Sequence, residues 1–147
     1  MTSKCVCQPG DVPNHSDIND ILSSHPNRLG HALFLSESNK ATVREQNIPI
    51  EICPSSNMKT MGLVSLNKHP ILNSLMNDTP TSINMDDMVV FDICLTDEYW
   101  AVAQAYGWDI QNAIHYVEQI IPQILDCSEI VRNNLRDKVE KYKNSMR

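Results

Sequence analysis

Two adjacent carboxylates, Asp86 and Asp87, end a short apolar segment of the sequence. Paired acids at the end of a buried strand can hold a metal ion or carry protons. Two upstream segments also end in polar groups, Arg28-Leu29-Gly30-His31 and Glu51-Ile52-Cys53-Pro54-Ser55-Ser56-Asn57. Each has an ordinary explanation by itself, since adjacent acids can cap a helix and close a turn, and a lone histidine on a strand is usually a packed core or rim residue. The prediction of a site therefore depends on the whole set of segments.

The elements that must position these residues alternate between strand and helix patterns. Short apolar runs predict strands at residues 4–7, 50–53 and 81–85, and residues 28–32, too short to assign by pattern alone, would be a fourth. Helical spacing of apolar residues predicts helices between them, with caps at Ser16 and at Ser38 or Asn39, and with Pro70 in a first turn. The rest of the chain reads as helices, with a cap at Thr96, a stop at Gly107, and further helices over 109–121 and 128–142. This alternation is typical of βαβ units around a parallel sheet.

Four βα units would make half of an eight-stranded (β/α)8 barrel, in which catalytic groups lie at the C-terminal ends of strands. The polar residues of this chain fall at those places: Gln8 to Asp11, His31, Ser55 to Asn57, and Asp86 with Asp87. Periodicity alone does not separate this half-barrel from an open α/β domain. The sequence contains neither G-x-G-x-x-G nor G-x-x-x-x-G-K, so a dinucleotide fold and a P-loop have no support.

The composition narrows the class of protein. The chain has 147 residues, of which 41% are hydrophobic, enough for one domain with a core. Its net charge of −6 argues against a partner made of nucleic acid. We expect no membrane span and no signal peptide, and hence a cytoplasmic protein. The five cysteines are scattered without a C-x-x-C pair, which is typical of small buried residues and not of a zinc or disulfide framework.

In this order the segments resemble the C-terminal half of the adenosine deaminase family. Residues 28–31 are similar to the family's sixth-strand R-[LI]-G-H, and residues 50–57 to its seventh strand and the loop that follows. Residues 84–87 are similar to its eighth-strand T-D-D, with Met85 where Thr is usual. Residues 8–14 resemble the fifth-strand H-x-G-E with the V-P-N tail of the adenosine-deaminase-like branch, which acts on N6-substituted AMP. The resemblance covers about residues 8–108. We therefore expect a partial barrel over residues 1–108 and C-terminal helices of the same domain over 109–147.

The resemblance implies zinc-dependent hydrolytic deamination of a purine nucleoside or nucleotide, from adenosine or N6-substituted AMP to inosine or IMP. Zinc in such sites makes hydroxide available near neutral pH. Asp86 would be a metal ligand, and His31 the catalytic imidazole that stabilises the attacking oxygen. Asp87 would contact the purine N7. Asp11 takes the position of the glutamate that moves a proton to the purine.

The remainder of the family's metal site is different in this chain. Gln8 occupies the position of the family's fifth-strand zinc histidine. Asp11 is one methylene shorter than the usual glutamate, so its carboxylate reaches about 1 Å less far. None of the five histidines lies two residues from another, so the family's H-x-H pair has no counterpart. We expect zinc below stoichiometry and no useful deamination by this chain alone, unless a replacement ligand such as His69 or Cys7 is recruited.

Two further classes of protein remain open on the sequence. The chain could be a non-catalytic half-barrel pseudoenzyme that serves as an interaction scaffold, or it could be a fragment of a longer product. An open half-barrel exposes its edge strands and the inner face of its sheet. This predicts self-association or a partner, such as a missing N-terminal half.

Overall fold

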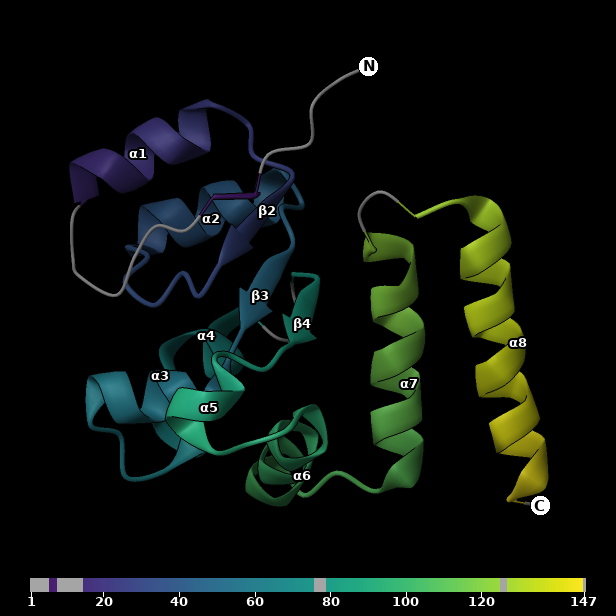
Figure 1. Cartoon of the computed structure of the whole chain (residues 1–147). Helices are drawn as coiled ribbons and strands as arrows, with labels where there is room; N and C mark the ends of the chain where they lie inside the picture. The colour runs from purple at the N-terminus through teal and green to yellow at the C-terminus, as the bar shows by residue number, and fades with distance from the viewer. Residues whose placement is uncertain (1–5, 8–14, 76–78, 125–126, 147) are drawn as a thin grey trace.

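The computed structural model describes residues 6–7, 15–75, 79–124 and 127–146, and these form a parallel sheet with helices between and after its strands (Figure 1). The sheet has four strands in the order β1-β2-β3-β4. They are β1 (Val6–Cys7), β2 (Arg28–Gly30), β3 (Ile50–Ile52) and β4 (Thr81–Ile83). All neighbouring pairs are parallel, so the predicted four βα units are confirmed.

Helices lie between the strands, and further helices follow β4. The α-helices are α1 (His15–Ser23), α2 (Glu37–Glu45), α3 (Pro54–Met61), α4 (Pro70–Leu75), α5 (Met88–Phe91), α6 (Leu95–Tyr106), α7 (Ile110–Ile120) and α8 (Glu129–Ser145). Two short 3-10 helices, η1 (Leu66–Lys68) and η2 (Ile121–Gln123), complete the set within the described residues.

The sheet order determines which face the helices cover. Parallel crossovers are almost always right-handed, and here each strand lies beside the strand that precedes it in the chain. When every crossover is right-handed and leads to the next strand on the same side, all of the connecting helices lie on one face of the sheet. The opposite face then has no helical layer from these connections, as in the inner wall of a barrel.

Burial of the strand residues follows this division. Leu29, Ile50 and Ile52 are fully buried on the helix-covered face. Arg28 and Glu51, on the other face, are partly exposed and form an ion pair across β2 and β3. Alternation with period two is what a strand with one covered face requires. The core is therefore the layer between the sheet and its helices.

The helix starts differ from the sequence prediction at three places. α1 begins at His15, so the expected cap residue Ser16 lies inside the helix. Ser36, and not Ser38 or Asn39, caps α2: its hydroxyl accepts the amide of Asn39 at 3.1 Å. Cys94, and not Thr96, precedes α6, where the Asp97 carboxylate accepts the Cys94 amide at 2.8 Å. In α2 and α6 the residue that completes the capping box sits three positions after the cap, which is the usual reciprocal arrangement.

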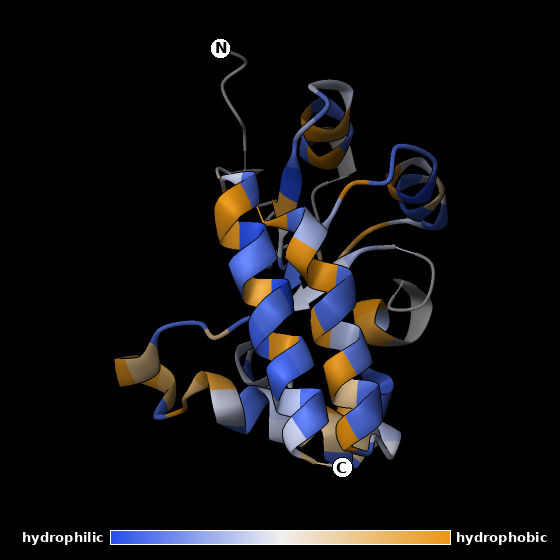
Figure 2. Ribbon diagram, turned by 90° about the vertical axis from the view of Figure 1, so that its right-hand side faces the viewer, coloured by the Kyte–Doolittle hydropathy of each residue, from blue (hydrophilic) through white to orange (hydrophobic). Residues whose placement is uncertain are grey.

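The last two long helices form an antiparallel pair (Figure 1). Figure 2 shows polar and apolar residues interleaved along both of them. Lys143 of α8 lies 2.8 Å from the Glu118 carboxylate of α7. The hydroxyl of Tyr116 donates to the Thr81 carbonyl at 2.6 Å and thereby fastens α7 to β4. Among the described residues, no helix combines the length and the apolar character that a bilayer crossing needs.

Candidate functional site

The backbone turns sharply at His31, directly after β2. His31 and Ala32 both have left-handed backbone angles, with φ of 58° and 53°. The Ala32 amide donates to the Gly30 carbonyl at 2.7 Å, which closes a three-residue turn around His31. Such a turn is rare for residues other than glycine, and each outlier costs on the order of 1–3 kcal/mol. The chain therefore leaves the sheet at His31, the residue that carries the imidazole.

Three consecutive residues at the start of α3 each bond to a different polar group. The Ser55 amide and hydroxyl donate to the Glu98 carboxylate at 3.0 and 2.9 Å. The Ser56 hydroxyl donates to Asp86 Oδ2 at 2.7 Å. Asn57 Nδ2 lies 2.9 Å from His31 Nδ1. This segment therefore links the ends of β2 and β4 to one helix terminus.

The sequence predicts a loop at residues 54–57, where the structure has the start of α3. Pro54 occupies the first turn of the helix, where its missing amide costs nothing. Glu98 supplies the acceptor for the next amide and is fully buried. The signal that could have located the helix is Pro54 followed by small polar residues, at a position where a helix can begin.

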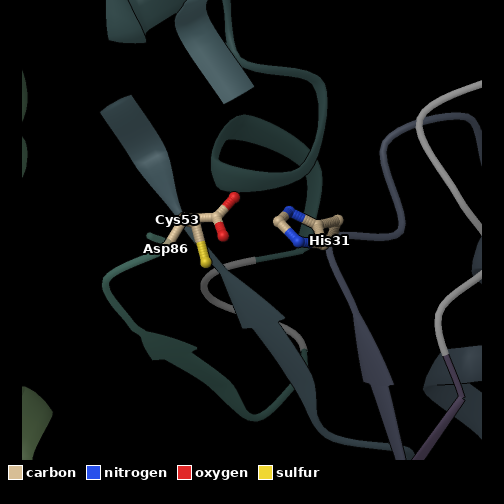
Figure 3. A group of neighbouring side chains, drawn as sticks. All are labelled: His31, Cys53 and Asp86. Atoms are coloured by element: carbon tan, nitrogen blue, oxygen red, sulfur yellow. The ribbon is translucent and has the colours of Figure 1, made fainter. Parts of the chain in front are cut away.

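His31 and Asp86 line one open hollow of about 300 Å³ at the C-terminal ends of the strands. Figure 3 shows the His31 ring facing the Asp86 carboxylate, with the Cys53 thiol beside them. The ligand-type atoms of these three side chains all lie within 4.8 Å of one another, and no other such group of three was found in the described part of the chain. Cys53 was not predicted as a site residue, since a single cysteine after a strand carries no distinctive spacing.

Asp87 follows Asp86 but is engaged differently. Its Oδ1 accepts the amides of Val89 and Val90 at 2.9 and 3.1 Å, and so Asp87 caps α5. This is the ordinary capping role that the sequence also allowed. Asp11 and Gln8, the predicted proton carrier and the residue at the zinc histidine position, lie outside the described residues.

The charges of the site are shaped mainly by hydrogen bonds and burial. The Ser56 hydroxyl lowers the pKa of Asp86, and the Asp87 amide and the His31 ring act in the same direction. Burial raises the pKa of Glu98, which the two Ser55 bonds partly oppose. Asp86 is therefore held as a carboxylate facing the hollow, in the state that binds a cation or accepts a proton.

The donor set only partly fits a zinc ion. Imidazole, thiolate and carboxylate are all zinc ligands, but a catalytic site needs three of them converging within about 2.0–2.3 Å of the ion. Atoms up to 4.8 Å apart must close in to reach that geometry, and His31 Nδ1 already bonds to Asn57. The sequence offers no H-x-H pair to complete the set. Asp86 is the residue whose type and exposure fit a metal directly.

Comparisons with known proteins identify relatives of this arrangement. The sequence pattern of the Adenosine deaminase family matches residues 5–142. The adenosine deaminase-like protein of Drosophila pseudoobscura pseudoobscura is 31% identical over 143 residues, which are 97% of this chain and 42% of that protein. The structure of arabidopsis ADAL complexed with IMP superposes with a TM-score of 0.89 at 25% identity, covering 97% of this chain and 42% of that one.

A more distant structure shares the fold alone. It is a cog1816 amidohydrolase from Burkhoderia ambifaria with bound Zn, and it superposes with a TM-score of 0.74 at 12% identity. The chain spans about two fifths of the length of the adenosine deaminase-like proteins that it matches. The expected fold, a part of a (β/α)8 deaminase barrel, is confirmed by these superpositions.

Proposed function

We propose, because this chain belongs to the adenosine deaminase family, that it supplies one part of a purine deaminase active site and does not complete the reaction alone. The reaction adds water at C6 of adenosine or N6-substituted AMP and releases the amine, to give inosine or IMP. The observation that carries this proposal is the convergence of His31 and Asp86, from two different strands, within 4.8 Å in one hollow.

Three residues of this chain, His31, Asp87 and Asp11, would each have a separate role in this reaction. His31 would hydrogen-bond the oxygen that attacks C6, where the developing charge needs a donor. Asp87 would meet the purine N7 through Oδ2, since Oδ1 is used by α5. Both the carboxylate oxygen and N7 accept hydrogen bonds, so this contact needs one proton between Oδ2 and N7. Asp11 would be a shortened proton carrier.

Zinc would be held by Asp86 together with ligands from outside this chain. When bound, it supplies a hydroxide near neutral pH. We propose that this chain alone holds zinc below one equivalent, since Gln8 replaces one histidine and the H-x-H pair has no counterpart. Residues 109–147 would belong to the same domain as the sheet, supported by the Tyr116 bond to β4 and the Arg28 bond to the Gln123 carbonyl at 2.9 Å.

The missing part of the site would come from a first-half partner that meets the exposed apolar residues after β4. The same exposed surface supports a second candidate, a non-catalytic interaction scaffold. Val89, Val90 and Trp100 are 87%, 68% and 65% exposed. Figure 2 shows the short α5 as an apolar element that projects from the rest of the chain.

A reconstitution experiment separates these functions. The purified chain is assayed for zinc content and for inosine, IMP and released amine with adenosine, AMP and N6-methyl-AMP. We expect less than one zinc per chain and no product above that of the Asp86→Ala variant. The assay is repeated with the separately expressed part of arabidopsis ADAL that this chain does not cover.

Restored zinc binding and turnover that disappear in Asp86→Ala would support the deaminase proposal. Tight binding of the two parts without turnover would favour the scaffold. Zinc-dependent turnover by the chain alone would contradict the statement that it needs a second part.

A further inference from the structure

His31 is hydrogen-bonded to a chain of two buried polar side chains, and neither of these lines the hollow. Asn57 and His69 are both 0% exposed. His69 Nε2 lies 3.2 Å from Asn57 Oδ1, and Asn57 Nδ2 lies 2.9 Å from His31 Nδ1. Buried polar groups of this kind are nearly always fully bonded, so the direction of each hydrogen bond can be worked out from its partners.

Backbone amides at the start of α4 determine which nitrogen of His69 accepts and which donates. His69 Nδ1 lies 3.2 Å from the amide of Ile71 and 3.2 Å from the amide of Leu72. These are the second and third residues of α4, the positions at which a cap residue accepts. A backbone amide only donates, and so Nδ1 of His69 must be the unprotonated nitrogen.

The charge state of His69 then places its proton. Burial lowers the pKa of His69 to about 4, which leaves the ring neutral near pH 7. A neutral imidazole with an unprotonated Nδ1 carries its proton on Nε2. His69 therefore donates from Nε2 to Asn57 Oδ1.

The orientation of the Asn57 amide in turn determines which nitrogen of His31 accepts a hydrogen bond. With Oδ1 facing the His69 donor, the amide nitrogen Nδ2 is turned to His31, and an amide nitrogen only donates. His31 Nδ1 must accept, so whenever the His31 ring carries a single proton, that proton sits on Nε2. The opposite tautomer would require the Asn57 amide to flip and would place its NH2 group against the His69 N–H.

We propose that His69 and Asn57 are positioning residues that hold His31 as the Nε2–H tautomer, so that it presents a hydrogen-bond donor to the reacting oxygen and not a lone pair to a metal. The part that concerns the reacting oxygen rests on the proposed function. The tautomer follows from the bonds of this chain alone. The same tautomer would keep His31 from acting as a metal ligand, although it lies within 4.8 Å of Cys53 and Asp86. His69 is excluded as a replacement ligand by its own bonds.

The tautomers can be observed directly by long-range 15N–1H correlation NMR on the 15N-labelled full chain at about pH 8, where an ordinary imidazole is neutral. We expect both His31 and His69 to show an unprotonated Nδ1 and a protonated Nε2. Asn57→Asp is nearly isosteric and turns the donor facing His31 into an acceptor. We expect the His31 proton to move from Nε2 to Nδ1 in this variant.

Two further variants keep the proposal testable if a buried carboxylate prevents folding. Asn57→Ser removes the contact to His31 and should give a mixture of both His31 tautomers. Ser56→Ala, one residue away, should leave the His31 tautomer unchanged. A wild-type His31 protonated on Nδ1, or a tautomer unaffected by both Asn57 variants, would overturn the proposal. The measurement uses no catalysis, so a failure of the deaminase proposal in the reconstitution assay would not alter it.

Discussion

The Ser56 hydroxyl lies 2.7 Å from Asp86 Oδ2, although the two residues come from different βα units. This bond joins the start of α3 to the segment after β4, and it is the largest influence on the Asp86 carboxylate. A hydroxyl that donates to a carboxylate favours the charged form. The site therefore depends on a helix that the strands alone do not specify.

Replacement of Ser56 by alanine is expected to raise the pKa of Asp86 toward its ordinary value. The charged form loses its main hydrogen bond, so protonation becomes easier. A 13C-detected NMR titration of the aspartate carboxyl carbons measures this change. Ser55→Ala is the matched control, because Ser55 bonds to Glu98 and not to Asp86. An equal rise in both variants would mean that general loosening of α3, and not the Ser56 bond, controls Asp86.

The buried His69 is expected to make the chain less stable as the pH falls. The pKa of His69 is lowered by burial from 6.5 to about 4 in the folded chain. Between these values the unfolded chain binds more protons, so the free energy of unfolding decreases with falling pH and levels off below about pH 4. Over the whole window His69 contributes about 3 kcal/mol, at about 1.4 kcal/mol for each pKa unit.

Urea unfolding at several pH values between 7 and 4 tests this contribution. His69→Gln removes the titrating group and should flatten the pH dependence by roughly that amount. His115 is exposed, and His115→Gln should keep the wild-type slope. A wild-type slope in His69→Gln would show that other groups cause the loss of stability.

Truncation of Glu98 is expected to destabilise α3. Its carboxylate accepts both the amide and the hydroxyl of Ser55 and is fully buried. Glu98→Ala leaves these donors unpaired, at a cost of about 1–3 kcal/mol. Glu98→Gln keeps an acceptor and removes a charge that burial disfavours, so its cost should be smaller. Denaturant unfolding at pH 7 gives both values. Asp97→Ala, on the exposed side of the same helix, should cost less than Glu98→Ala.

The exposed apolar residues of α5 are expected to drive association of the isolated chain. Val89 and Val90 are 87% and 68% exposed, and neighbouring exposed apolar side chains favour association. Sedimentation velocity should show association that grows with concentration and that Val89→Asp or Val90→Asp reduces. Ile130→Asp changes a 74% exposed apolar residue on α8 and should have little effect. A wild-type chain that stays monomeric at every concentration would contradict this expectation.

The strands and the placement of the site could be predicted from the sequence for simple physical reasons. Short apolar runs closed by proline or polar residues leave few alternatives to strands, and parallel strands bring their C-terminal ends to one edge. Asp86 was found because it directly follows such a run, whereas His31 was found through the resemblance of residues 28–31 to a family motif. The ion pair of Arg28 with Glu51 and the turn at His31 needed the structure, since neither leaves a pattern in the local sequence.

Contacts between distant segments account for most of what the sequence did not indicate. The start of α3 depends on Glu98, 43 residues away, and the orientation of His31 depends on His69 through Asn57. A buried histidine that caps a helix looks the same in sequence as one on the surface. Pairwise bonds across the fold, and not local propensity, determine these details.

The consecutive contacts of Ser55, Ser56 and Asn57 make this segment sensitive to changes in length. A point substitution disturbs one of the three bonds and leaves the other two in place. Insertion or deletion of one residue would shift every side chain by about 100° around α3 and would separate all three partners at once. We expect variation in this stretch to be confined to substitutions, with gaps accepted only further along the helix or in the surface loops.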